Sequence, residues 1–234
     1  MSGAHLPLFW VVIPAAGIGS RMRADRPKQY LQLAGRTVLE HTLDCFLGHP
    51  QLKGLVVCVA RDDAYWPDLA CSTELRVHCA DGGSERADSV LGGLRKLSQL
   101  GASDNDWVLV HDAARPNLAV TDLNHLLGLL ADDPVGGLLA VPARDTLKRA
   151  NADGRVQETV DRSVIWQAFT PQMFRLGALR EALADALASG VAVTDEASAL
   201  EWAGHHPRLV EGRADNLKIT RPEDLQWLEQ RWKS

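Results

Sequence analysis

The sequence predicts an α/β fold with a mostly parallel sheet that is covered by helices on both faces. Short apolar runs, rich in β-branched residues, alternate along the chain with amphipathic segments of helical spacing. Strands that are apolar at nearly every position are typical of buried parallel sheets, and their alternation with helices indicates βαβ units. A chain of 234 residues can form one large α/β domain or two small ones, and we expect a single domain over residues 1–234.

Five runs are expected to be strands because they are short, mostly apolar and rich in β-branched or aromatic residues. In chain order they are Leu8–Ile13, Leu55–Ala60, Arg76–Ala80, Trp107–His111 and Leu138–Val141. Four longer segments repeat apolar residues every three or four positions, which predicts helices packed on the sheet. These segments are Val38–Leu47, Glu85–Leu97, Asp122–Ala131 and Leu176–Ser189.

The C-terminal region is expected to return to the core. Pro207–Glu211 and Asn216–Ile219 have the pattern of short strands. A last helix is predicted to open at residues 221–224, with Thr220 as its N-cap. A Pro and two acids then fall in its first turn, where helices favour them.

Residues 142–170 interrupt the alternation with two polar halves joined by Asn151-Ala152-Asp153-Gly154. This tetrapeptide favours a hairpin turn, and the flanks are too charged for core strands. One interpretation is a solvated hairpin. We favour a protruding arm that packs on another subunit, because an isolated polar hairpin is only marginally stable without a partner surface.

Composition limits the class of partner and the compartment. The formal net charge is −5 and no dense Lys/Arg run occurs, so nucleic acid is not an expected partner. The apolar runs are far shorter than a membrane span, and no basic segment precedes the first of them as in a signal peptide. The four cysteines lack C-x-x-C spacing, which favours reduced thiols over metal ligands. We therefore expect a cytoplasmic protein without a membrane partner.

The most informative motif follows the first strand and reads VVIPAAGIGSRMRADRPK, from Val11 to Lys28. Small residues allow a ligand to approach the backbone, and consecutive N–H groups form an anion-binding concavity. Arg21 and Lys28 add positive charge for a polyanion such as a triphosphate. A G-x-G alone fits an ordinary strand–turn–helix corner equally well. The whole string resembles the triphosphate-binding signature of nucleotidyltransferases that activate sugars and polyols.

Two other phosphate-binding motifs are excluded. The chain lacks Gly-Lys-Ser/Thr, so the motif is not a P-loop. Met22 stands in place of the third Gly of a dinucleotide-binding G-x-G-x-x-G, and Arg36 and Thr37 stand where that motif needs an acid.

Three later segments place polar groups at expected strand ends. Asp81–Ser89 puts a Gly pair and serines at a helix start, where they can hold a base or ribose or simply cap the helix. His111–Pro116 puts Asp112 at the carboxyl end of a central strand, which suits a Mg²⁺ ligand or an ion pair with Arg115. Glu211–Lys218 brings a further acid and a further cation.

Together these segments resemble one family, the 2-C-methyl-D-erythritol 4-phosphate cytidylyltransferases of the isoprenoid precursor pathway. The resemblance implies a Rossmann-like nucleotidyltransferase fold and the joining of CTP to methylerythritol phosphate with release of pyrophosphate. Ser84 departs from members that carry Asp there, but it keeps a hydroxyl near the cytidine. The matching strings lie in the family's order over residues 12–225: PAAGIGSRM, PKQY, DGGSERADSV, VHDAARP, Arg144-Asp145-Thr146, TVDR, TDEASALE, EGRADNLK and TRPEDL.

The resemblance also implies residue roles. The catalytic residues are Arg21, Lys28, Arg162 and Lys218. Arg21 and Lys28 bind the triphosphate and stabilise the charge that builds on the α-phosphorus and on pyrophosphate, and Lys218 reaches the α-phosphate. CTP is bound by Pro14, Ala15, Ala16, Gly17, Gly19, Gly83, Ser84, Ser89, Asp112 and Ala113. The polyol phosphate is bound by Arg115, Thr146, Arg162 and Thr194. Two of these, Thr146 and Arg162, lie on the arm, which in the family reaches into the neighbouring subunit of a homodimer. Mg²⁺ or another divalent cation is held by Asp112 and Asp215.

Two alternatives remain open. One is a cytidylyltransferase for another polyol phosphate, such as ribitol 5-phosphate, against which the TDEASALE string argues. The other is a non-catalytic nucleotide-binding regulator. Arg21, Lys28 and Lys218 argue against it, because a sensor needs no charge for a leaving pyrophosphate.

A phosphate monoester is mostly dianionic at neutral pH and attacks without a general base. Nucleophilic catalysis by His111 or Cys79 is not expected, because no Ser/Cys–His pairing supports it.

Overall fold

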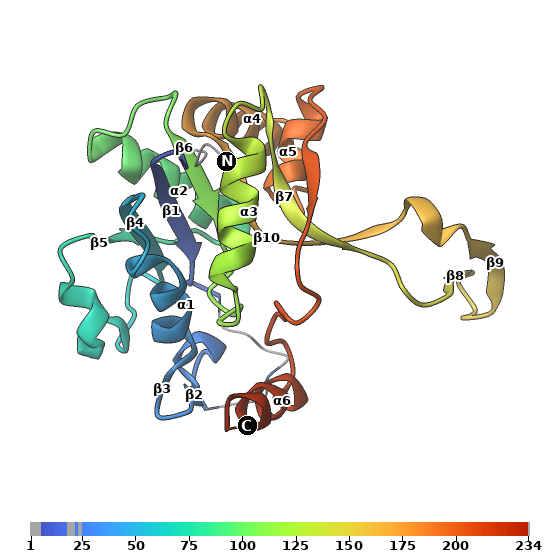
Figure 1. The fold of residues 1–234 in the computed structure, drawn as a ribbon, viewed down its shortest axis with the longest axis horizontal. Helices are drawn as coiled ribbons and strands as arrows, with labels where there is room; N and C mark the ends of the chain where they lie inside the picture. The colour runs from blue at the N-terminus through green and yellow to red at the C-terminus, as the bar shows by residue number, and fades with distance from the viewer. Residues whose placement is uncertain (1–5, 18–21, 23–24, 234) are drawn as a thin grey trace, which may run out of the picture.

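The computed structural model describes residues 6–17, 22 and 25–233 and has a seven-stranded sheet at its centre (Figure 1). The strand order is β11-β7-β10-β6-β1-β4-β5. Strand β10 runs antiparallel to both of its neighbours, β6 and β7, and the other neighbouring pairs are parallel. The predicted mostly parallel sheet is confirmed. The strands are β1 Phe9–Pro14, β4 Leu52–Val59, β5 Val77–Asp81, β6 Trp107–Val110, β7 Gly136–Pro142, β10 Trp166–Arg175 and β11 Arg208–Glu211.

Helices cover both faces of this sheet, as the sequence predicts (Figure 1). Helices α1 and α3 contribute apolar side chains to the core on one face, and α2, α4 and α5 contribute to the core on the other. Their bounds are α1 Val38–Leu47, α2 Arg86–Gln99, α3 Val120–Leu130, α4 Leu176–Ala188 and α5 Glu196–Trp202.

The alternation of side chains along β1 explains how one strand contributes to the apolar core on both faces of the sheet. Phe9, Val11 and Ile13 belong to the core beneath α1 and α3, whereas Trp10 and Val12 belong to the core beneath α2, α4 and α5. Successive side chains of a strand point to opposite faces, so a strand that is apolar throughout supplies two cores at once.

The predicted elements are confirmed within a few residues, with two exceptions. Asn216–Ile219 is irregular rather than a strand, because its backbone joins Ala114 through Ile219 instead of forming a ladder. The last helix, α6 (Pro222–Lys233), begins two residues after Thr220, whose hydroxyl donates to Asp224 instead of capping the helix. Strand β10 and helix α5 were not predicted.

Strand β10 was not predicted because its two halves differ in exposure to solvent. Its first residues, from Trp166, extend the arm and are largely exposed, whereas Thr170 to Phe174 are buried in the sheet. The register with β7 shifts between Ala168 and Gln172. Helix α5 has only seven residues and is preceded by the polar Asp195, which caps it with Ser198.

The segment 142–170 forms the predicted hairpin and projects away from the sheet (Figure 1). Strands β8 (Leu147–Ala150) and β9 (Val156–Val160) pair with each other in a small sheet of their own. Their turn contains Gly154 at φ 73°, a conformation that favours glycine. Most of their side chains are exposed, so the hairpin buries little apolar surface within one copy of the chain.

A smaller apolar cluster joins the C-terminal helix α6 to the segment that follows the N-terminal motif. Leu228 of α6, Leu33, Val38 and Ile219 are all buried in it. Among the described residues, no helix has the length and apolar character needed to cross a bilayer. The remaining short elements are the 3₁₀ turns η2 Lys28–Tyr30, η3 Trp66–Asp68, η4 Ala70–Thr73 and η5 Arg162–Val164, and the strands β2 Gln32–Leu33 and β3 Arg36–Thr37.

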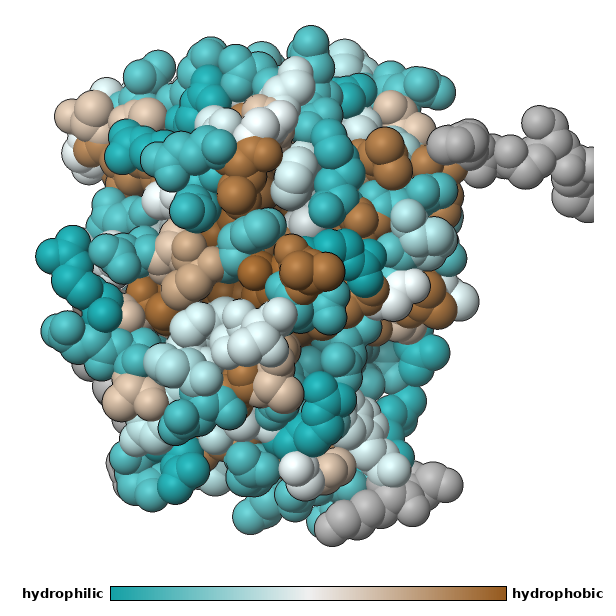
Figure 2. Space-filling view, turned by 90° about the vertical axis from the view of Figure 1, so that its left-hand side faces the viewer, coloured by the Kyte–Doolittle hydropathy of each residue, from teal (hydrophilic) through white to brown (hydrophobic). Residues whose placement is uncertain are grey.

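Seen from the side of β5, the molecular surface is mostly hydrophilic, and apolar side chains reach it in several separate places (Figure 2). Strand β5 forms this edge of the sheet, and only alternate residues of it are exposed. All four cysteines lie in the described part of the chain and are free thiols, as expected.

Candidate active site

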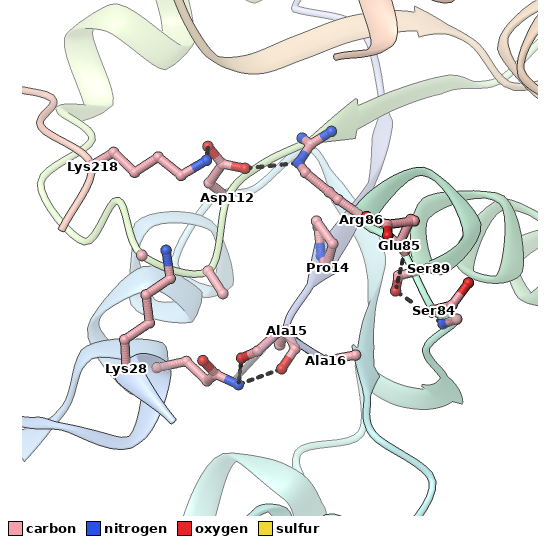
Figure 3. A pocket seen from close by; sticks show the side chains of 15 residues that line it. Pro14, Ala15, Ala16, Lys28, Ser84, Glu85, Arg86, Ser89, Asp112 and Lys218 are labelled. Atoms are coloured by element: carbon pink, nitrogen blue, oxygen red, sulfur yellow. Dashed lines mark hydrogen bonds and ion pairs between the residues drawn. The ribbon is translucent and has the colours of Figure 1, made fainter. Parts of the chain in front are cut away.

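A cavity of about 310 Å³ opens where the parallel strands β1, β5 and β6 end (Figure 3). Loops at the carboxyl ends of parallel strands are where open α/β sheets bind ligands. The cavity is lined from the loop after β1, the loop after β5 with the start of α2, and the loop after β6. The lining residues are Pro14, Ala15, Ala16, Gly17, Lys28, Gln29, Gly83, Ser84, Glu85, Arg86, Ser89, Asp112, Ala113, Ala114 and Lys218.

Two adjacent glycines are needed because neither position has room for a Cβ atom. A Cβ on Gly82 would overlap the Cβ of Ala16, and one on Gly83 would overlap the Cβ of Asp88. The loop after β1 is held from the other side by Gln29, whose amide donates to the carbonyls of Ala15 and Gly17. Small side chains therefore bring two loops close enough to form one wall of the cavity.

We expect Gly82→Ala to destabilise the fold by about 1–3 kcal/mol, the usual cost of overpacking a tight contact. The added methyl group must push the Ala16 loop away or distort the loop after β5. The measurement is urea unfolding of the variant against the wild type. Gly48→Ala is the matched control, because a Cβ at that position would meet no described atom within 4 Å beyond its chain neighbours, and the φ of Gly48 is −78°. Equal stability of the two variants would contradict the steric explanation.

The start of α2 is built by its own side chains. Ser89 Oγ accepts a hydrogen bond from the Gly83 N–H at 3.0 Å and donates to the Glu85 carbonyl at 3.1 Å. The Asp88 carboxylate accepts from Ser84 Oγ at 2.8 Å and from the Glu85 N–H. Ser84 is thus not the N-cap, a position that Glu85 occupies. Both serines line the cavity, and their hydroxyls are engaged in ordering its wall, while their binding of CTP stays a prediction.

Asp112 is the centre of charge in the site. Its carboxylate lies 3.0 Å from Arg86 Nε, 2.9 Å from Lys218 Nζ and 3.3 Å from Arg115 Nε. Burial alone would raise the pKa of Asp112, but the charges of Arg86, Lys218 and Arg115 outweigh it and hold this pKa far below its usual value. Asp112 is therefore an anion throughout the physiological pH range, and the surrounding cluster carries a net positive charge.

A second cavity, of about 290 Å³, adjoins the first and shares Arg86, Asp112 and Lys218 with it. Its own lining comes from β10, from the segment before α5 and from Arg115, whose guanidinium lies 4.7 Å from the ring centre of Phe169. The residues found only in this cavity are Arg115, Ala168, Phe169, Thr170, Gln172, Thr194 and Asp195. Two ligands could therefore meet at the three shared side chains.

His111 supports the site without taking part in it. Its side chain is fully buried, and burial lowers its pKa to about 4, so the ring is neutral. Nε2 must carry the proton because it lies 3.0 Å from the carbonyl of Arg115, which can only accept. Nδ1 then accepts from the hydroxyl of Thr170, which itself accepts from the Asp112 N–H. His111 thus fixes the backbone at Asp112, as expected of a structural residue.

The structure gathers most of the predicted binding residues around the two cavities. Gly19 and Arg21 lie outside the described residues. Of the predicted residues that are described, Thr146, Arg162 and Asp215 line neither cavity. Thr146 and Arg162 are exposed on the arm, where Arg162 donates to the carbonyl of Arg144. The Asp215 carboxylate is bound by Arg213 and Arg231.

Three residues of the site were missed by the sequence analysis. Arg86 and Glu196 form a buried ion pair beside Asp112, and Gln29 holds the loop after β1. Arg86 and Glu196 both lie inside strings that the sequence analysis singled out, DGGSERADSV and TDEASALE. The sequence could have indicated Arg86 and Glu196 as charged residues at the starts of two helices. Nothing in the sequence showed that these two helices lie side by side.

Asp112 is the residue of the site that could help to hold a metal ion brought by a phosphate ligand. In residues 6–17, 22 and 25–233, no group of three or more His, Cys, Asp or Glu side chains could hold a metal ion. Mg²⁺ commonly binds one or two carboxylates together with substrate phosphates and water. Asp112 offers one such carboxylate in the wall shared by both cavities, and a substrate-borne Mg²⁺ would have to share that carboxylate with Arg86, Arg115 and Lys218.

Comparison with known proteins points to one family. Residues 9–231 match the family model described as 2-C-methyl-D-erythritol 4-phosphate cytidylyltransferase. The chain is 73% identical over 227 residues to the protein of that name from Pseudomonas putida strain KT2440, with 97% of each chain covered. It is also 73% identical to the one from Pseudomonas aeruginosa strain UCBPP-PA14, with 96% of each chain covered.

Solved structures agree with this result. A crystal structure named 4-diphosphocytidyl-2C-methyl-D-erythritol synthase is 40% identical, with a TM-score of 0.83 over 96% of this chain and 97% of that one. The 2-C-methyl-D-erythritol 4-phosphate cytidylyltransferase of Francisella tularensis is 35% identical, with a TM-score of 0.83 over 97% of this chain and 100% of that one. The chain therefore belongs to the 2-C-methyl-D-erythritol 4-phosphate cytidylyltransferase family.

Proposed function

We propose that this protein joins CTP to 2-C-methyl-D-erythritol 4-phosphate, giving 4-diphosphocytidyl-2-C-methyl-D-erythritol and pyrophosphate. Membership of the family supports the reaction. The structural observation that carries it is the pair of adjoining cavities that share Arg86, Asp112 and Lys218. A reaction that joins two phosphate-bearing substrates needs two binding spaces that meet at a positively charged point.

The first cavity is the proposed CTP site. The backbone of Pro14 to Gly17 and the Gly83 loop would hold the cytosine and ribose, with Ser84 and Ser89 ordering the wall and Asp112 and Ala113 closing it. Lys28 enters the same cavity from the 3₁₀ turn η2 and would bind the triphosphate together with Arg21. Fixed positive charge near the leaving group stabilises the transition state without reorganisation during the reaction.

The second cavity is the proposed polyol phosphate site. Arg115 and Thr194 line it and offer a guanidinium and a hydroxyl to the substrate. The phosphate oxygen of the substrate would attack the α-phosphorus of CTP, forming one P–O bond while the bond to the β-phosphate oxygen breaks and pyrophosphate leaves. Lys218 lies in the lining of both cavities and would neutralise the α-phosphate as the two anions approach.

No general base is needed for this step. The second pKa of a phosphate monoester is about 6, so the nucleophile is already mostly deprotonated at neutral pH. A bound Mg²⁺ would neutralise phosphate charge, and Asp112 is the residue that would hold it. Asp215 stays a predicted second ligand, although its carboxylate is engaged by two arginines.

We further propose that the arm completes the site of a second copy of the chain. Thr146 and Arg162 are exposed on the arm, outside the cavities of their own chain. Val156 and Val164 of the arm segment are 65% and 74% exposed, which suits burial against a partner. Exchange of arms between two chains would form a closed two-fold homodimer, the commonest oligomer symmetry.

The direct test is an assay of pyrophosphate release with CTP, Mg²⁺ and one polyol phosphate at a time. We expect release with methylerythritol phosphate and far less with ribitol 5-phosphate. Faster turnover of ribitol 5-phosphate would favour the alternative cytidylyltransferase. Binding of CTP without release from any polyol phosphate would favour a nucleotide-binding regulator. UTP in place of CTP serves as the control for the nucleotide site.

A further inference from the structure

Arg86 occupies the boundary between the two cavities. It is the first residue of α2, and it lines both cavities together with Asp112 and Lys218 (Figure 3). Its side chain is 28% exposed, so one part of the guanidinium faces the open space while the rest is enclosed. A fixed cation at this point faces any pair of ligands that fill both cavities.

Two carboxylates hold the guanidinium from different directions. Nε donates to Asp112 Oδ1 at 3.0 Å, while Nη1 and Nη2 donate to the two oxygens of Glu196 at 2.6 and 3.1 Å. The Glu196 side chain is 1% exposed, so the carboxylate of this bidentate pair is almost completely buried, whereas Arg86 is partly exposed. Bidentate pairing of Arg with a carboxylate fixes orientation as well as distance.

The pair also connects the walls of the two cavities. Arg86 begins α2, whose first turn faces the first cavity, and Glu196 begins α5, directly after Thr194 and Asp195 of the second cavity. The start of α5 is anchored in turn to β10. Gln172 donates to Asp195 Oδ2 at 2.9 Å and accepts from the Ala197 N–H at 2.8 Å.

Donor capacity remains on Arg86 for the two ligands. The bonds to Asp112 and Glu196 use three of the five N–H groups of a guanidinium, which leaves two for a ligand. Without Glu196 the guanidinium would be free to turn toward the incoming phosphates and release Asp112. The carboxylate of Glu196 therefore keeps the Arg86 guanidinium from turning toward the ligand.

We propose that Arg86, held in place by Glu196, is a positioning residue that fixes the Asp112 carboxylate at the point where the two substrates meet. The inference rests on the proposed cytidylyltransferase function. Positive charge alone cannot fix Asp112 in this way, because a lysine carries the same charge as Arg86 but cannot bind two carboxylates at once through a planar group. Arg86→Lys therefore separates charge from geometry.

The test is a double-mutant cycle of Arg86→Lys, Glu196→Gln and the double variant. We expect each single variant to lower kcat about tenfold or more, with a smaller change in either KM, because the link orders groups needed in the transition state. The double variant should be about as slow as the slower single one, since both changes break the same link. Circular dichroism and melting temperature are measured on every variant.

Arg180→Lys is the matched control. Arg180 is paired with Asp104 at 2.9 Å and has a side-chain exposure of 25%, close to that of Arg86, but it lies outside both cavity linings. We expect its kcat to equal that of the wild type. This comparison removes the general effect of shortening a half-buried, ion-paired arginine.

Three results would overturn the proposal. They are unchanged kcat in Arg86→Lys, additive losses across the cycle, or a lower melting temperature with normal kcat, which indicates a purely structural pair. If Glu196→Gln melts below the assay temperature, Glu196→Asp replaces it in the cycle, because it keeps the charge and shortens the reach. A wild-type enzyme without pyrophosphate release refutes the proposed function instead, so the two failures are distinguishable.

Discussion

Lys28→Ala is expected to lower kcat by about 10²-fold or more, because it removes a fixed cation from the proposed triphosphate site. Lys28 lines the first cavity together with the shared cluster of Arg86, Asp112 and Lys218 (Figure 3). Negative charge on the β- and γ-phosphates rises as the bond to the α-phosphorus breaks, so the loss of Lys28 should fall on kcat more than on KM. Steady-state pyrophosphate release at saturating substrates measures it.

Melting temperature should change little in the Lys28→Ala variant, because Lys28 is half-buried in the cavity wall and does not belong to the apolar core on either face of the sheet. Lys96→Ala serves as the control, since Lys96 is also half-buried but lies outside both cavities. A kcat near that of the wild type in Lys28→Ala would refute the assigned role. A loss of the same size in Lys96→Ala would attribute the effect to removal of any lysine.

Mixing two inactive variants is expected to restore activity if the arm serves the neighbouring chain. Lys28→Ala damages the cavity and Arg162→Ala damages the arm, and each variant should be nearly inactive alone. In a heterodimer, one site combines both lesions and the other has neither. Random subunit exchange should therefore restore about one quarter of the wild-type sites, measured as pyrophosphate release over time after mixing.

The control for this experiment is a mixture of Lys28→Ala with Lys218→Ala. Both residues line the cavity of their own chain, so no exchange of arms can assemble an intact site from them. Activity in that mixture would show contamination or another form of rescue. A heterodimer that is confirmed by native mass spectrometry and remains inactive would show that Arg162 acts within its own chain, which refutes the shared site.

The parts of the fold that follow from local pattern were predictable from the sequence. Strand β1 was recognised because it is a short, continuous run of apolar and β-branched residues, and helix α1 because its apolar residues recur every three or four positions. Strand β10 was not, because half of it is solvated in the arm and half is buried in the sheet, so no single pattern describes it. Local sequence reports the environment of a segment only where that environment is uniform.

The candidate site shows the same division. Pro14 to Gly17 and Asp112 could be predicted because a strand end and a small-residue turn mark them locally. The pairing of Arg86 with Glu196, which are separated by 110 positions in sequence, depends on how α2 and α5 meet on one face of the sheet. A long-range contact of this kind leaves no spacing signal, so only the assembled fold reveals it.

The residues that line the two cavities come from separate stretches of the sequence. Apart from Lys218, the first cavity is built from residues 14–114. Apart from Arg115 and the three shared side chains, the second is built from residues 168–195. If the first cavity binds the nucleotide and the second binds the acceptor, as we propose, the two specificities are encoded in consecutive, separate stretches of the chain. A designed chimera could then exchange the later stretch for one that fits another acceptor and keep residues 14–114 unchanged.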